Sequence, residues 1–211
     1  MNIMSIEKWM FERRLRPETL SHFLCELDNN GNLDMPVHSV HGEHYFTVTR
    51  NFDGGAKYVV SPSSAHSSLC LYGLPQAFNS VIIGNSITVV EGPADVFVHH
   101  QSKIHSCVSS LSARISNFQA NLLSLFADTI YILFDGDAAG EEAAQRITSK
   151  KIFPKTTKVL AATIAGHDPA SFYASGGDLR AVRYLMEQYA QSLSYVKFSP
   201  SLKTIERIPK D

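Results

Sequence analysis

The chain has 211 residues, of which 44% are hydrophobic, and its formal net charge is -1. This length and composition suit one substantial globular domain, or a domain with a smaller appendage. A near-neutral charge excludes a strong global attraction to nucleic acid or membrane, so any nucleic-acid contact has to come from a local basic face. The three scattered cysteines exclude a disulfide framework, and no apolar run is long enough to span a bilayer. We therefore expect a cytoplasmic protein without a membrane partner.

The first 80 residues predict a small α+β subdomain. Residues 5–26 have the pattern of two short helices, and Pro17 fits the first turn of the second. Two β-rich runs within 44–60 flank a Gly-Gly turn and predict a hairpin. Residues 71–78 then lead into a short helix.

From about residue 81 the pattern changes to alternating strands and helices, which is typical of a parallel sheet flanked by helices. The strands are short, continuous apolar runs, as expected where both faces of a sheet are buried. They lie at 87–91, 105–108, 129–134 and 157–162. Helices are expected at 92–100, 115–126, 138–150 and 178–193. The chain thus divides into three expected parts, at 1–80, 81–176 and 177–211.

Two of the later segments have distinctive patterns. In the helix at 115–126, helical spacing places Ile115, Phe118 and Leu125 on one apolar face, together with Leu122 and Phe126. The tail from Val196 has basic residues around prolines. We therefore expect a last helix followed by a loose or partner-bound basic end.

Acidic residues stand where the strands of the expected sheet end. Glu91 closes the first strand, and Asp135 and Asp137 directly follow the third. Asp95 falls on the first turn of the next helix, and Asp168 lies just beyond the last strand. Because the carboxyl ends of parallel strands share the edge where ligands bind, these carboxylates are expected to converge. A cluster of like charges is costly unless cations neutralise it, which predicts Mg²⁺ (or Mn²⁺) and phosphoryl transfer.

Each acidic residue also has a purely structural interpretation. Asp135 and Asp137 fit a turn followed by a helix N-cap, Glu91 can simply end its strand, and Asp168 can cap a helix. Carboxylates at three successive strand ends favour a shared site over three unrelated structural roles.

Five segments resemble, in order along the chain, the catalytic core of bacterial (DnaG-type) DNA primases. They are Ala56–Pro62, with its Lys-Tyr-Val-Val-Ser-Pro pattern, Leu71–Leu74, Val89–Asp95, Phe134–Gly140 and Gly166–Pro169. The third and fourth of these resemble the Toprim domain that primases share with topoisomerases and related nucleases. The resemblance extends roughly from residue 7 to residue 175.

The resemblance implies an α/β fold, in which a Toprim-type parallel sheet flanked by helices follows a small α+β N-terminal subdomain. It implies that Glu91, Asp135 and Asp137 are the catalytic, metal-binding residues. Asp95 and Asp168 match further acidic positions and are expected to contribute to the metal site.

The same resemblance assigns basic residues to the nucleotide and the template. Lys57, in the Lys-Tyr segment, is expected to face a nucleotide or template phosphate, although an exposed strand lysine is the simpler interpretation. Arg50, at the end of the preceding strand, is a weaker candidate for the same groove. The implied activity is synthesis of short primers on single-stranded DNA from nucleoside triphosphates, during DNA replication.

Several family features differ in this chain. The zinc-binding template module is absent, the loop between Pro62 and Leu71 is short, and Ala170 stands where the family has a second aspartate. We therefore expect a phage or mobile-element protein, partnered by a helicase or by a separate zinc-containing template reader. Two alternatives stay open: a Toprim nuclease, and a non-catalytic nucleic-acid-binding subunit of the replication machinery.

Overall fold

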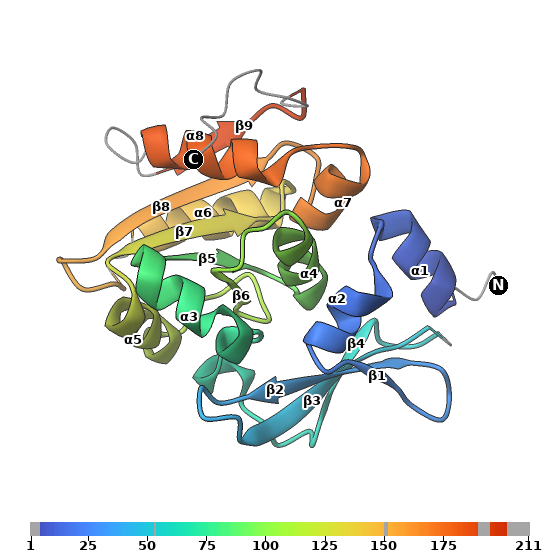
Figure 1. Cartoon of the computed structure of the whole chain (residues 1–211). Coiled ribbons are helices and arrows are strands. Elements are labelled where there is room, and N and C mark those ends of the chain that lie inside the picture. The colour runs from blue at the N-terminus through green and yellow to red at the C-terminus, as the bar shows by residue number, and fades with distance from the viewer. Residues whose placement is uncertain (1–4, 53, 150–151, 190–194, 202–211) are drawn as a thin grey trace.

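The computed structural model describes residues 5–52, 54–149, 152–189 and 195–201. These residues form two β-sheets, one below the other in the view of Figure 1. One sheet is antiparallel, with strand order β1-β2-β3-β4. The other is fully parallel, with strand order β6-β5-β7-β8-β9. The predicted architecture, a helix-flanked parallel sheet behind a small α+β part, is confirmed.

The N-terminal part consists of two short helices and the antiparallel sheet. Its elements are α1 (Ile6–Arg13), α2 (Pro17–His22), β1 (Glu26–Leu27), β2 (Leu33–His38), β3 (His44–Arg50) and β4 (Tyr58–Ser61). A 3-10 turn, η1 (Ser67–Leu69), and helix α3 (Leu74–Gly84) lead to the parallel sheet.

The parallel part alternates strands and helices as expected. Its elements are β5 (Ser86–Val90), α4 (Pro93–Gln101), β6 (Cys107–Ser109), α5 (Asn117–Phe126), β7 (Thr129–Phe134), α6 (Ala138–Ser149), β8 (Lys158–Ile164), α7 (Pro169–Ala174), α8 (Leu179–Tyr189) and β9 (Tyr195–Phe198). Across the described ranges, none of the helices is both long and apolar enough to cross a lipid bilayer.

The predicted hairpin is confirmed, but the sheet around it is larger than expected. β3 and β4 pair antiparallel, and Gly54 and Gly55 between them have positive φ angles. The sequence did not predict β2, which pairs with β3 along its whole length. Proline disfavours sheet interiors, and β2 contains Pro36. It is tolerated there because β1 pairs only with the start of β2.

Both faces of the parallel sheet are buried. Along β7, Ile130, Ile132 and Phe134 pack on the side covered by α3, α5 and α6. Tyr131 and Leu133 pack on the opposite side with α4, α7 and α8. The apolar cluster on this second side continues into the N-terminal part, so the two sheets share one core.

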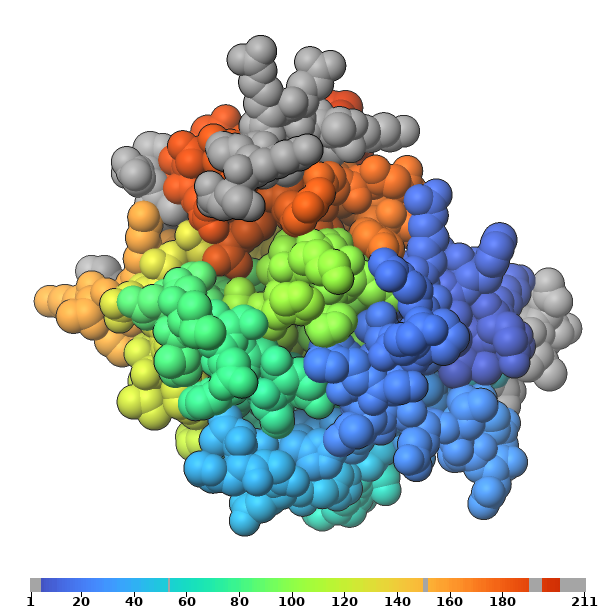
Figure 2. Space-filling view, viewed as in Figure 1, coloured from blue at the N-terminus to red at the C-terminus, as the bar shows by residue number. Residues whose placement is uncertain are grey.

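A buried glutamine joins the N-terminal helices to the parallel part. The Gln101 side chain accepts hydrogen bonds from the Arg16 backbone N–H (2.8 Å) and the Thr19 hydroxyl (2.9 Å). Its amide group donates to the Arg14 carbonyl (2.9 Å) and the Tyr173 hydroxyl (3.2 Å). In the space-filling view the N-terminal helices lie directly against α4 and α7 (Figure 2). This contact fixes the position of the antiparallel sheet relative to the parallel one.

The apolar face predicted for residues 115–126 meets the core only in part, through Ile115, Leu122 and Phe126. Phe118 and Leu125 are 49% and 75% exposed, whereas Gln119, Ala120 and Leu123 are fully buried. Hydrogen bonds of Gln119 explain this orientation of the helix. The Gln119 amide donates to three backbone carbonyls, including that of Ser110 at 3.1 Å. These bonds hold the side of the helix with Gln119, Ala120 and Leu123 against the core.

The expectation of a loose tail from Val196 is also wrong for its first residues. Tyr195–Phe198 form β9, a fifth strand that pairs parallel with β8. Main-chain pairing along the edge of β8 orders this segment, and the Phe198 side chain is buried. The other basic residues of the predicted tail, Lys203, Arg207 and Lys210, lie outside the described residues.

Candidate active site

The ends of β5 and β7 lie next to each other and are joined through their acidic residues. Glu91 follows β5 and Asp135 follows β7, and the two strands pair in parallel. The Asp135 backbone N–H donates to Glu91 Oε1 at 3.0 Å. On its other side, the Ser109 hydroxyl donates to the Glu91 carbonyl oxygen at 2.6 Å. Glu91 is therefore held at the centre of three adjacent strand ends.

Gly136 lets the loop after β7 approach the loop after β8. A Cβ atom at this position would lie 1.7 Å from the carbonyl oxygen of Ile164. The Gly136 N–H instead donates to the His167 carbonyl at 2.9 Å, and the Gly136 carbonyl accepts from the Gly166 N–H at 3.0 Å. Only glycine fits this close approach, which brings the end of β8 to the site.

Asp137 and Asp168 have the capping roles that the structural interpretation predicted. The exposed Asp137 accepts from the Gly140 N–H at 2.8 Å and so caps α6. Asp168 accepts from the Ser171 N–H and is the N-cap of α7. Each of these caps uses the Oδ1 atom of its aspartate, and the Oδ2 atom takes no part in the cap.

Asp95 is buried, and both of its oxygens are used. Oδ1 accepts from the Ala170 N–H at 3.0 Å, and Oδ2 accepts from the Gly92 N–H at 3.3 Å. Burial raises the pKa of Asp95 well above its usual range, and the charges of Asp135 and Asp168 add to this effect. Asp95 thus joins the start of α4 to the start of α7.

A cleft of about 270 Å³ lies between the antiparallel sheet and these strand ends. From the parallel side it is lined by Glu91, Asp95, Asp135 and Asp168. From the N-terminal side it is lined by Arg13, Val48, Lys57, Tyr58 and Val60. Of the predicted site residues, the structure therefore brings five together in one cleft, and it places Asp137 and Arg50 outside its lining.

The electrostatics of the cleft are dominated by the acidic cluster. Burial raises the pKa of Asp135 to about 7, with further contributions from the charges of Glu91, Asp168 and Asp137. Lys57 opposes this effect and lowers the pKa of Asp135. Burial also raises the pKa of Glu91, again with contributions from Asp137 and Asp168. A cation bound here would relieve an unfavourable concentration of negative charge.

The donor set fits a divalent cation that takes some of its ligands from the substrate. The Oδ1 atom of Asp135 is buried and has no hydrogen-bond partner among the described residues. In that part of the chain, no three Asp, Glu, His or Cys side chains are arranged to hold one ion. Mg²⁺ is commonly bound by one or two carboxylates together with waters and substrate phosphates. Asp135 and Glu91 fit this pattern without a complete shell from the protein.

The two predicted basic residues differ in their surroundings. Lys57 is exposed at the mouth of the cleft, just before β4. Arg50, the last residue of β3, is 7% exposed, and its guanidinium lies over the rings of Phe52 (5.7 Å) and Tyr58 (5.1 Å). Its Nε and one Nη atom have no hydrogen-bond partner among the described residues. Arg50 therefore lies behind Tyr58, which itself faces the cleft.

Sequence reasoning missed several residues of the cleft wall. Arg13 reaches it from the end of α1, and Leu111 and Ser112 reach it from the loop after β6. The position of Leu111 and Ser112 just after a strand of the parallel sheet could have indicated their place in the cleft, because ligands bind beyond the carboxyl ends of such strands. No local pattern distinguishes Arg13 from its basic neighbours.

Comparison with known proteins agrees with this architecture. Residues 85–163 match the Toprim domain family. The DNA primase of Buchnera aphidicola is 38% identical over 92 residues, which are 43% of this chain and 16% of that protein. The DNA primase of Deinococcus radiodurans is 32% identical over 149 residues, which are 69% of this chain and 25% of that protein. This chain thus spans a quarter or less of these two relatives.

Solved structures show the same fold over a larger share of the chain. The DnaG primase catalytic domain bound to single-stranded DNA superposes with a TM-score of 0.71 and 21% identity. The match covers 89% of this chain and 75% of that one. The fold and the acidic strand ends agree with the match of residues 85–163 to the Toprim domain family. The chain is similar to the catalytic core of bacterial DNA primases, as its sequence motifs indicated, and this similarity is consistent with use of a divalent metal.

Proposed function

We propose that this chain is a primase-like nucleotidyltransferase that synthesises short primers on single-stranded DNA. The central observation is the buried Oδ1 of Asp135, which has no hydrogen-bond partner within the described residues and lies in a cleft whose opposite wall is basic. A nucleoside triphosphate and a divalent cation together satisfy both walls, because the cation balances the carboxylates and the phosphates balance Lys57 and Arg13.

The acidic side of the cleft holds the cation in this proposal. Glu91 and Asp135 are its principal ligands, and Asp137 and Asp168 add negative charge around the site. Mg²⁺, or Mn²⁺, would neutralise the triphosphate and lower the pKa of the attacking 3′-hydroxyl. Asp95 positions α4 and α7 around this site through its two backbone hydrogen bonds.

The basic side of the cleft holds the nucleotide and the template. Lys57 lies at the cleft mouth and is suited to a phosphate of the nucleotide or the template. Tyr58 offers an aromatic surface for a base, and Arg50 supports it from behind. Support for a single-stranded template comes from the related primase domain that binds such DNA. A helicase or a separate zinc-containing chain is the proposed partner that supplies template selection.

The test is primer synthesis on single-stranded DNA with labelled nucleoside triphosphates and Mg²⁺ or Mn²⁺. Glu91→Gln and Asp135→Asn are expected to abolish product formation. Glu142→Gln removes the same charge from an exposed position of α6 and is expected to leave synthesis unchanged. Metal-dependent cutting of the template without synthesis would favour a Toprim nuclease. DNA binding without any turnover would favour a non-catalytic replication subunit.

A further inference from the structure

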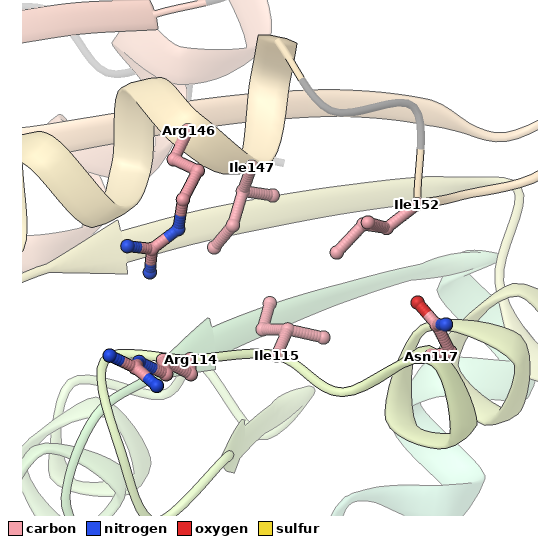
Figure 3. A pocket seen from close by; sticks show the side chains of 6 residues that line it. All are labelled: Arg114, Ile115, Asn117, Arg146, Ile147 and Ile152. Atoms are coloured by element: carbon pink, nitrogen blue, oxygen red, sulfur yellow. The ribbon is translucent and has the colours of Figure 1, made fainter.

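A second pocket lies in the Toprim domain, apart from the acidic cleft. Its volume is about 470 Å³. It is formed by the loop before α5, the first residue of that helix, the last turns of α6 and one residue beyond it. Its lining residues are Arg114, Ile115, Asn117, Arg146, Ile147 and Ile152 (Figure 3).

The pocket has a basic end, an apolar middle and an amide at its other end. Figure 3 shows the guanidinium groups of Arg114 and Arg146 at the same end. Ile115 and Ile147 face each other beside them, and Asn117 lies farther along the pocket. Such a sequence of groups matches the parts of a nucleotide, with phosphate at one end and base at the other.

The guanidinium groups of the two arginines are not used in contacts within the described part of the chain. Among the described residues, no ion pair or side-chain hydrogen bond is formed by the guanidinium of Arg114 or Arg146. By contrast, Arg180 and Arg183 on α8 both pair with carboxylates. Two neighbouring cations without an anion form an attractive site for a phosphate group, which a guanidinium binds with two parallel hydrogen bonds.

We propose that this pocket binds one nucleotide of a single-stranded nucleic acid. The phosphate lies between Arg114 and Arg146, and the base packs on Ile115 and Ile147. The Asn117 amide offers both a donor and an acceptor to the base edge. The volume falls within the usual range of small-molecule sites, which accommodates a nucleotide unit.

The position of the pocket favours a strand over a free nucleotide. Leu111 and Ser112 line the acidic cleft, and Arg114 is two residues farther along the same loop. The Ser112 hydroxyl accepts from the Arg114 N–H at 3.1 Å and donates to the Arg114 carbonyl at 2.9 Å. One short loop therefore borders both sites, so a strand in the cleft can continue to the pocket. This choice of ligand rests on the proposed function.

The test measures binding of a fluorescent single-stranded oligodeoxynucleotide by anisotropy, in EDTA and over a range of salt concentrations. Arg114→Gln/Arg146→Gln is expected to weaken binding about tenfold and to reduce the slope of log K against log salt by about 0.7 for each lost phosphate contact. Arg114→Lys/Arg146→Lys keeps the charges and is expected to retain most of the slope. Arg16→Gln/Arg180→Gln removes the same charge from exposed positions elsewhere and is expected to bind like wild type.

Three results would overturn the proposal. The first is unchanged binding by the double glutamine variant, with thermal unfolding showing it to be folded. The second is an equal loss of binding in the Arg16/Arg180 control, which would mean that only net charge matters. The third is competition by a mononucleotide as strong as that by an oligonucleotide. Because the assay contains no metal, a failure of primer synthesis with intact, arginine-dependent binding would affect the proposed function alone.

Discussion

Replacing Asp135 by asparagine is expected to stabilise the metal-free protein at alkaline pH. The pKa of Asp135 is about 7 in the folded protein, compared with 3.8 for an ordinary aspartate. Between these two values the folded state binds more protons than the unfolded state, so stability falls as the pH rises from about 4 to about 7. Above pH 7 Asp135 is ionised in both the folded and the unfolded state, so the loss of folding stability stays constant.

The size of the effect follows from the same two values. At about 1.4 kcal/mol for each pH unit between them, the upper limit is about 4 kcal/mol. Because the carboxylate borders a solvent-filled cleft, screening reduces this figure, and we expect about 2 kcal/mol. For a chain of this size, that stabilisation corresponds to a rise in Tm of about 4–8 °C.

The assay is thermal unfolding of wild type and Asp135→Asn in EDTA at pH 4 and pH 8. The variant is expected to unfold at a higher temperature at pH 8 and at nearly the same temperature at pH 4. Added Mg²⁺ is expected to raise the Tm of wild type and to have much less effect on the variant. Glu142→Gln, which changes an exposed carboxylate, serves as the control. A variant that is less stable than wild type at pH 8, or equally shifted at both pH values, would refute the reasoning.

Three further substitutions test other parts of the structure. Gly136→Ala is expected to cost about 3 kcal/mol or more, because the new methyl group collides with the Ile164 carbonyl, and Tm measures the loss. Gln101→Ala removes four hydrogen bonds and is expected to cost about 2–4 kcal/mol in urea unfolding. Lys57→Ala is expected to reduce primer synthesis about tenfold. It is also expected to shift the acid limb of the pH–rate profile to higher pH, because Lys57 lowers the pKa of Asp135.

Each of these three has a clear contrary result. An alanine at position 136 with unchanged Tm would mean that the two loops separate freely. Unchanged urea unfolding of the Gln101 variant would show that water replaces its partners at no cost. For position 57, Lys57→Arg is the matched control and is expected to keep the pH profile. An alanine variant with the same profile as the arginine variant would exclude an electrostatic role.

The prediction of the parallel sheet succeeded because its signals are local. Each buried strand is a continuous apolar run, and each helix between strands has its own spacing and caps. The acidic residues were found for the same reason, since they directly follow these runs. Their common edge followed from the rule that parallel strands end together, and the adjacent ends of β5 and β7 agree with it.

The local sequence pattern did not predict the structure correctly where contacts with residues far along the chain decide a residue's position. The sequence analysis did not predict β2, which contains Pro36 and is paired with β3 along its length. Gln119 lies outside the apolar face predicted for its helix and is fully buried, because backbone carbonyls of distant loops accept its amide protons. The start of the C-terminal tail looked loose and pairs with the edge of β8 as β9.

The sequence by itself determined the class of fold, the order of the elements and the identity of the acidic residues. Only the tertiary structure decided what each side chain faces. It placed Asp137 on the outside as a cap and used both oxygens of Asp95 within the protein. Among the residues that the structure describes, it left Asp135 Oδ1 without a hydrogen-bond partner. It also brought Arg114 and Arg146 to one pocket. Such groupings depend on contacts between residues far apart in the chain, and these are set by packing rather than by the pattern of neighbouring residues.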